Sequence, residues 1–155
     1  MKLVDKLTVM YHDRKVGELT LTPDRRRCAF QYDKNWLVSG FSISPLDLPL
    51  KPDLFIASPE PFYGNFGIFE DSLPDGRYLL NRILRKEKID DSTLTPLQRL
   101  SIVGRTGMGA LSYIPESYIG EDKTLPELDE LQELALAVLG EKTDEGEEVL
   151  YFNSG

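Results

Sequence analysis

Apolar and polar residues alternate in three short runs near the start of the chain. The runs cover residues 7–11, 16–22 and 28–32, and a period of two residues is typical of a strand with one buried face. Short polar segments, 12–15 and 23–27, separate the runs. Three short strands joined by tight turns predict an antiparallel meander.

A proline-rich segment follows the meander. One helical turn is expected first, at residues 36–38, with Asp33 or Asn35 as its cap. Five prolines then fall within 17 residues, which excludes a long helix or a central strand. We therefore predict an extended, packed loop with short strand pieces around Pro45, Pro49, Pro52, Pro59 and Pro61.

Helical spacing dominates the middle of the chain. Aromatic residues at positions 62, 66 and 69 are spaced as on one face of a helix. A second helix is predicted from Asp71 or Ser72, with Pro74 in its first turn, to about Lys88. A third begins with Thr95 as cap and ends at Gly104. The residues that these last two helices are expected to bury are Tyr78, Leu79, Ile83, Leu84, Leu97, Leu100 and Val103.

The last third of the chain combines short strands with a leucine-rich amphipathic stripe. In order, we expect a strand at 110–114 ended by Pro115, a polar link at 115–123, a capping box at 124–127, a helix closed by Gly140, an acidic loop at 142–148 and a strand at 149–152. The whole pattern predicts an α+β fold. Its parts are a small antiparallel or mixed β-sheet with an early β-meander, several packed helices, a C-terminal acidic amphipathic helix and a short strand.

Charge is distributed unevenly along the 155 residues. Residues 1–120 carry 16 basic and 15 acidic side chains, whereas residues 121–155 carry 2 basic and 11 acidic ones. The acidic end is expected to be either a solvated helix face with a loop or a surface for a basic partner. Arg25–Arg27 is the one basic cluster, read as a solvated turn or a phosphate contact. The acidic balance argues against nucleic acid as a direct ligand.

Composition limits the compartment and the chemistry. The single cysteine, Cys28, excludes an internal disulfide, and no apolar run approaches the length of a membrane span or a signal peptide. We expect a soluble cytoplasmic protein. Cys28 and the single histidine, His12, do not make a zinc site. The glycines of residues 104–109 follow a helix rather than precede one, so a tight turn is favoured over a phosphate loop.

The residues therefore predict no catalytic constellation and no metal site, which favours a binding or accessory module. The aromatic cluster of residues 55–69 is expected to be core under the proline-rich loop or, alternatively, a binding surface.

Six sequence motifs, in order, resemble the amino-terminal subdomain of HipA-type serine/threonine kinase toxins. The resemblance spans about residues 7–116 and weakens beyond. The motifs are Val16–Leu19, Phe30–Tyr32 followed by Trp36–Leu37, Ile43–Ser44 leading to Leu48–Leu50, Phe62 through Leu73–Arg77, Leu100–Arg105 and Met108–Glu116.

The resemblance implies two parts: a subdomain at residues 1–116 and an acidic helical extension at 117–155 that leads towards a kinase core. In the family, ATP and Mg²⁺ belong to that core, so no cofactor is expected for this chain by itself. Ser154 and Gly155 would be only the edge of an ATP loop. The catalytic residues of the family lie in sequence that this chain does not contain, and we predict no kinase activity for it.

Three functions remain open on this resemblance. The first is a regulatory module that binds a HipA-like kinase core, a HipB-like antitoxin, or both. The second is the amino-terminal lobe of a single-chain HipA-like kinase toxin, and the third is an interaction domain unrelated to a kinase. The predicted partner-binding segments are 43–76 and 125–139, and within them Phe62, Phe66, Glu127, Glu130 and Glu133.

Overall fold

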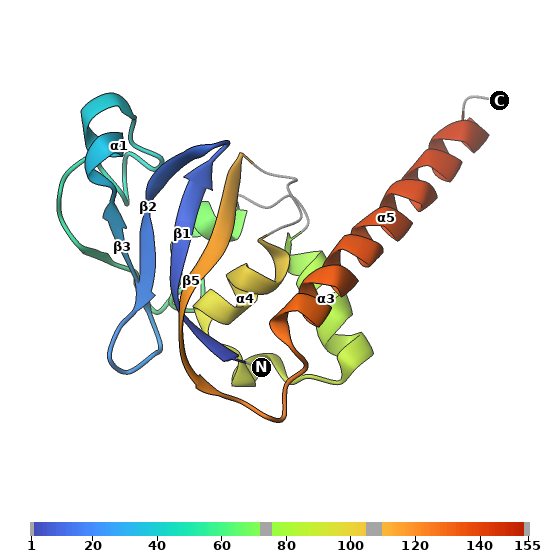
Figure 1. Ribbon diagram of the computed structural model, residues 1–155. Coiled ribbons are helices and arrows are strands. Elements are labelled where there is room, and N and C mark those ends of the chain that lie inside the picture. The colour runs from blue at the N-terminus through green and yellow to red at the C-terminus, as the bar shows by residue number, and fades with distance from the viewer. Residues whose placement is uncertain (1, 72–75, 105–109, 154–155) are drawn as a thin grey trace.

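Five strands and five α-helices form an α+β structure in the computed structural model, which describes residues 2–71, 76–104 and 110–153 (Figure 1). The strands are β1 (Lys2–Tyr11), β2 (Arg14–Leu21), β3 (Cys28–Tyr32), β4 (Phe55–Ile56) and β5 (Leu111–Glu121). The helices are α1 (Lys34–Ser39), α2 (Gly67–Asp71), α3 (Gly76–Glu87), α4 (Pro96–Val103) and α5 (Leu128–Asn153), with a 3₁₀ turn η1 at Asp91–Thr93.

The strands make one antiparallel sheet in the order β4-β3-β2-β1-β5. β1 lies between its hairpin partner β2 and β5, which arrives about a hundred residues later; Thr8, for example, pairs with Ile114. α4 packs against β1, β2 and β5, and α3 and α5 pack against α4 and each other (Figure 1). The sheet therefore has one face buried under helices, as an antiparallel sheet in an α+β fold requires.

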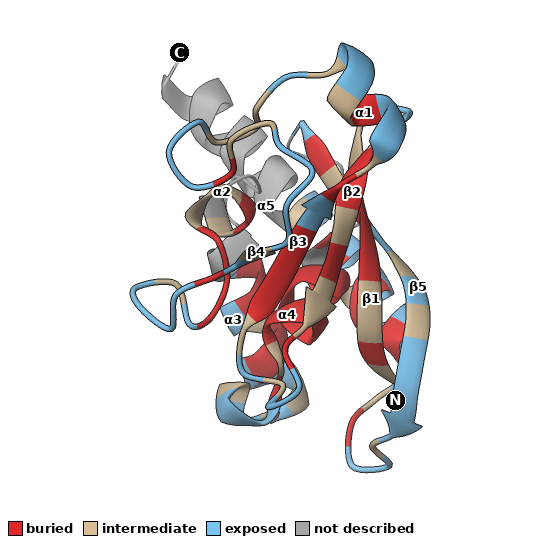
Figure 2. Ribbon diagram, turned by 90° about the vertical axis from the view of Figure 1, so that its left-hand side faces the viewer, coloured by how far each residue is buried: buried red, intermediate tan, exposed pale blue. Residues whose placement is uncertain are grey.

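The centre of the core is aromatic. Phe30 of β3 contacts Phe69 of α2 with ring centroids 5.4 Å apart, and Phe69 contacts Tyr113 of β5 at 6.0 Å. All three side chains are fully buried. Figure 2 shows buried residues concentrated along the inner strands and α4. These rings connect β3 to β5 through α2, and each buried ring adds a large apolar area to the core.

Local sequence signals produced the elements that were predicted most accurately. The meander is confirmed, and its first strand is longer than expected because it begins at Lys2. Asp33 caps α1 by accepting from the backbone N–H of Asn35 at 3.1 Å. Thr95 caps α4, Pro96 occupies its first turn, and Gly104 follows its last residue. Leu97 and Leu100 are buried as predicted, whereas the Val103 side chain and residues 105–109 lie outside the described residues.

The aromatic segment at residues 62–69 was predicted wrongly as one helix. Tyr63 and Gly64 have positive φ angles of 56° and 81°, so the chain turns there and α2 begins only at Gly67. Gly64 is required because an added Cβ would lie 2.0 Å from the Arg26 carbonyl oxygen. Phe62 precedes this turn, Phe66 follows it and Phe69 lies in α2, so the three positions do not share one helix face.

The prediction for α3 is confirmed in type and end point but wrong at one position. Leu79, Ile83 and Leu84 are buried, yet Tyr78 is 48% exposed. Tyr78 lies at the edge of the apolar stripe, where a ring can remain in solvent. Asp71 is the last residue of α2, and the capping expected from Ser72 and Pro74 lies outside the described residues.

Pro115 does not end β5. The strand continues to Glu121, so most of the expected polar link is β-structure. β5 is an edge strand, and an edge position tolerates a residue that has no N–H to donate. α5 begins at Leu128, later than a cap at Thr124 would place it, and the Thr124 hydroxyl donates to Asp122.

Gly140 does not close α5. The helix continues to Asn153, so the acidic loop at 142–148 and the strand at 149–152 were wrong. One glycine inside a helix costs about 1 kcal/mol. The rest of the helix is rich in Leu and Glu, good helix formers that offset this cost.

Gly17→Ala should destabilise the protein by about 3 kcal/mol, because a Cβ at this β2 position would lie 2.3 Å from the Gln31 carbonyl oxygen and 2.7 Å from the Phe30 ring. The free energy of unfolding in urea measures the effect. An unchanged midpoint would contradict the tight β2–β3 packing.

Gly140→Ala is the matched substitution at an open site, since nothing lies within 4 Å of its added Cβ. We expect a gain of about 0.5–1 kcal/mol in helix stability, because alanine loses less backbone entropy than glycine in a helix interior. Helicity by circular dichroism checks it. A loss of helicity would mean that the helix ends at Gly140.

Candidate functional site

Two of the predicted acidic residues line a groove between α5 and the end of α3. Its volume is about 500 Å³, and Glu130, Glu133 and Glu87 place carboxylates around Pro126, Leu134 and Ala137. Glu130 and Glu133 are exposed. We call these six residues the acidic groove. Glu127, which was predicted together with them, is exposed but does not line it.

Side-chain amides hold the helix that carries this groove. Gln132, on the opposite side of α5, is buried and donates to the Ser101 carbonyl of α4 at 2.9 Å. Gln98 of α4 in turn accepts from the backbone N–H of Val4 in β1. These two contacts tie α5 to α4 and α4 to the sheet, so the groove has a fixed position on the fold.

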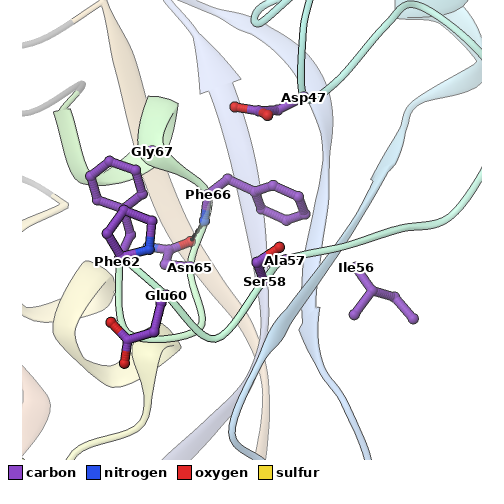
Figure 3. A pocket seen from close by; sticks show the side chains of 10 residues that line it. Asp47, Ile56, Ala57, Ser58, Glu60, Phe62, Asn65, Phe66 and Gly67 are labelled. Carbon is purple, nitrogen blue, oxygen red and sulfur yellow. Dashed lines mark hydrogen bonds between the residues drawn. The ribbon is translucent and has the colours of Figure 1, made fainter.

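The predicted aromatic pair lines a second, smaller pocket near β4 (Figure 3). Its volume is about 180 Å³, and we call it the β4 pocket. Phe66 is only 6% exposed, so its ring belongs to the core and contributes one wall. Phe62 is half-buried, and its ring lies against Gly67. The other lining residues are Asp47, Ile56, Ala57, Ser58, Glu60, Pro61, Asn65 and Gly67.

A third pocket, of about 340 Å³, lies between the Arg26–Arg27 turn and the Pro59–Gly64 loop. Asp24 also lines it. The Thr22 hydroxyl and the backbone N–H of Arg26 both donate to Asp24 and hold the pKa of its carboxyl below the usual range. The charged carboxylate offsets part of the positive charge, so the solvated-turn interpretation of this cluster is favoured.

Arg99 is a residue whose role the sequence did not reveal. Arg99 lies on α4 and is buried, with 8% of the residue exposed. Nη2 donates to the Tyr63 carbonyl at 3.2 Å, and the guanidinium lies 5.7 Å from the centre of the Tyr63 ring. Arg99 thereby fixes the Pro59–Gly64 loop to the helical layer. A charged side chain in an amphipathic helix gives no signal of such a distant partner.

The groups able to perform chemistry are separated from one another. His12 lies at the β1–β2 turn against the Tyr11 ring. Cys28 is fully buried in β3, and burial raises the pKa of its thiol. Across the described residues, no group of three or more histidine, cysteine or acidic side chains could hold a metal ion. No helix in the same part of the chain is long and apolar enough to cross a bilayer.

Comparison with protein families identifies the family to which the domain belongs. The family model of the HipA N-terminal domain matches residues 7–114. The chain belongs to the HipA N-terminal domain family. The match begins in β1 and ends in β5, and it includes β2, β3, β4 and the first residues of β5. This result confirms the resemblance drawn from the six motifs and gives the chain the context of HipA-type toxin–antitoxin systems.

The residues predicted to bind a partner or ATP do not all lie within the region that the HipA N-terminal domain model matches. The β4 pocket lies inside the matched region, whereas the acidic groove is formed mainly by α5, beyond residue 114. Ser154 and Gly155, the expected edge of an ATP loop, lie outside the described residues. The boundary between residues 116 and 117 remains a prediction.

Thiol labelling tests the inert character of Cys28. The folded protein should react with Ellman's reagent more than about a hundredfold more slowly than the urea-unfolded chain, because the thiol is buried and its pKa is raised. Absorbance of the released thiolate gives both rates. Rapid stoichiometric labelling in native buffer would contradict the burial of β3.

Proposed function

We propose that this HipA N-terminal domain is a non-catalytic regulatory module that binds a HipA-like serine/threonine kinase partner and restrains its activity. The observation that carries the proposal is the acidic groove. It combines an apolar floor with exposed carboxylates on a helix that is anchored to the domain core. Such a surface suits a protein partner with basic and apolar side chains.

The separation of reactive groups supports a binding role. Phosphoryl transfer needs a positioned base, metal ligands and phosphate-binding groups in one place. Among the described residues, the candidates for such roles are a turn histidine, a buried thiol and scattered carboxylates. A HipA-like core, a HipB-like antitoxin, or both would be the partner, and a cytoplasmic location follows from that proposal.

The amino-terminal lobe of a single-chain HipA-like kinase is the second candidate. The length of α5 favours it: the helix has 26 residues and begins beyond residue 114, where the family match ends. A helix that extends beyond the matched region in this way could lead into a further domain. The reading frame downstream in the DNA distinguishes the two candidates, because a continuous kinase core supports the lobe and a separate start codon supports the module.

Co-expression with a HipA-like kinase tests the proposal, and a kinase encoded next to this chain would be the first choice of partner. We expect the two proteins to purify together and autophosphorylation of the kinase to fall when the complex forms. Phosphate incorporation measured with and without this chain gives the result. No complex, or a complex with unchanged kinase activity, would contradict a restraining module.

Charge reversal tests the surface. Glu130→Lys and Glu133→Lys should each weaken kinase binding by about tenfold, because a basic partner would then meet a like charge. Calorimetry gives the dissociation constants. Asp13→Lys, an equal charge change at the exposed β1–β2 turn, is the control and should bind as the parent does. Equal affinity for all three variants would remove the acidic groove as the interface.

A further inference from the structure

The outer edge of β4 offers unpaired backbone groups. β4 is the last strand of the sheet and pairs with β3 through Ile56–Ala29 and Phe55–Phe30. The backbone N–H of Ala57 donates to the Cys28 carbonyl at 2.9 Å. Successive residues of an antiparallel strand alternate between facing the partner and facing away. The N–H and C=O of Ile56 therefore face away from β3, available to another strand.

Apolar side chains surround this edge. Leu46 is 96% exposed, Leu54 59% and Ile56 52%. Leu54 and Ile56 belong to β4 and its approach, while Leu46 precedes Asp47, which shares the lining of the β4 pocket with Ile56. Three exposed large aliphatic residues beside one unpaired edge are typical of a surface that another protein segment covers.

The β4 pocket has the size and the charge for one basic side chain. At about 180 Å³ it is smaller than the roughly 300 Å³ at which small-molecule sites begin. Its lining includes two carboxylates, Asp47 and Glu60, and no lysine, arginine or histidine. In Figure 3 these carboxylates lie on opposite sides of the pocket, the Phe66 ring lies near its middle and the Phe62 ring lies at one edge. An aliphatic stem can pack on the rings, and the two carboxylates give the pocket a negative potential that favours a single cation between them.

A divalent metal ion is a poor match for the same pocket. Calcium and magnesium need six or more oxygen ligands held close together. Here the two carboxylates are separated, and phenyl rings form part of the wall. The chemistry therefore favours an organic cation with an apolar stem.

Hydrogen bonds hold both sides of the pocket in place. On one side, the hydroxyls of Tyr32 and Ser42 donate to the Leu48 carbonyl, directly after Asp47. On the other, Asn65 accepts from the N–H of Phe66 at 2.8 Å and donates to Glu70 at 3.0 Å. Pocket walls held in this way need little reordering when a ligand enters.

We propose that β4 and the β4 pocket form one docking site for an extended segment of a protein partner. The segment adds a strand by pairing with Ile56 and places one arginine or lysine side chain in the pocket between Asp47 and Glu60. Main-chain pairing supplies affinity and the basic side chain supplies specificity, as in other cases of strand addition. The inference rests on the proposed function only in taking the partner to be a protein.

A capped pentapeptide of threonine, valine, arginine, valine and threonine is the probe. Titrated into the full chain, it should shift the backbone amide signals of Ile56, Ala57, Ser58, Asn65 and Phe66, with a dissociation constant of about a millimolar. Two altered peptides separate the contributions. Citrulline in place of arginine should bind about fivefold more weakly. N-methylation of both valines should cost about tenfold, because it removes strand hydrogen bonds.

Protein variants locate the charge contact. Asp47→Asn and Glu60→Gln should each weaken the arginine peptide by about threefold and leave the citrulline peptide unaffected. Asp53→Asn is the matched control, because Asp53 is an exposed carboxylate of the same loop that does not line the pocket. It should bind both peptides as the parent does.

Three outcomes would overturn the inference: no shifts at millimolar peptide, equal binding of the arginine and citrulline peptides, or shifts centred on α5. The titration uses no kinase, so its failure is distinguishable from failure of the proposed function. A kinase that co-purifies with the chain while the titration stays flat removes only the β4 docking site.

Discussion

Burial of one face of the sheet under α4 is the constraint on which the rest of the structure depends. α4 lies over β1, β2 and β5, and a chain of amides runs from β1 through Gln98 to α4 and from α4 to Gln132 of α5. Arg99 of the same helix donates to the Tyr63 carbonyl and thereby links α4 to the Pro59–Gly64 loop. Both candidate surfaces therefore derive their positions from one short helix of eight residues.

The two surfaces share an acidic character but differ in what they could recognise. The acidic groove is an open trough of about 500 Å³ on a helix, suited to several side chains at once. The β4 pocket is a small recess beside an unpaired strand, suited to one side chain with its backbone. A HipA N-terminal domain with both could bind one large partner at two places, which would raise affinity beyond either contact.

Local signals made much of the fold predictable, and long-range packing accounts for what was missed. Thr95 with Pro96, and Asp33 before α1, are caps whose partners lie within three residues. Asp47 and Glu60, by contrast, line one pocket from opposite sides, and the Tyr32 hydroxyl holds the Asp47 side through the Leu48 carbonyl. Glu87 joins Glu130 and Glu133 only after α3 packs on α5. No pattern in a single sequence encodes such a meeting.

The pairing of β1 with β5 has a consequence for synthesis of the protein. The β1–β2–β3 meander is complete once about thirty residues have left the ribosome, but the partner for the other side of β1 is translated about eighty residues later. During that interval one side of β1 is an unsatisfied edge, open to pairing with other nascent chains. Slow closure of this long-range pair should make translation speed and chaperone access important for the yield of folded protein.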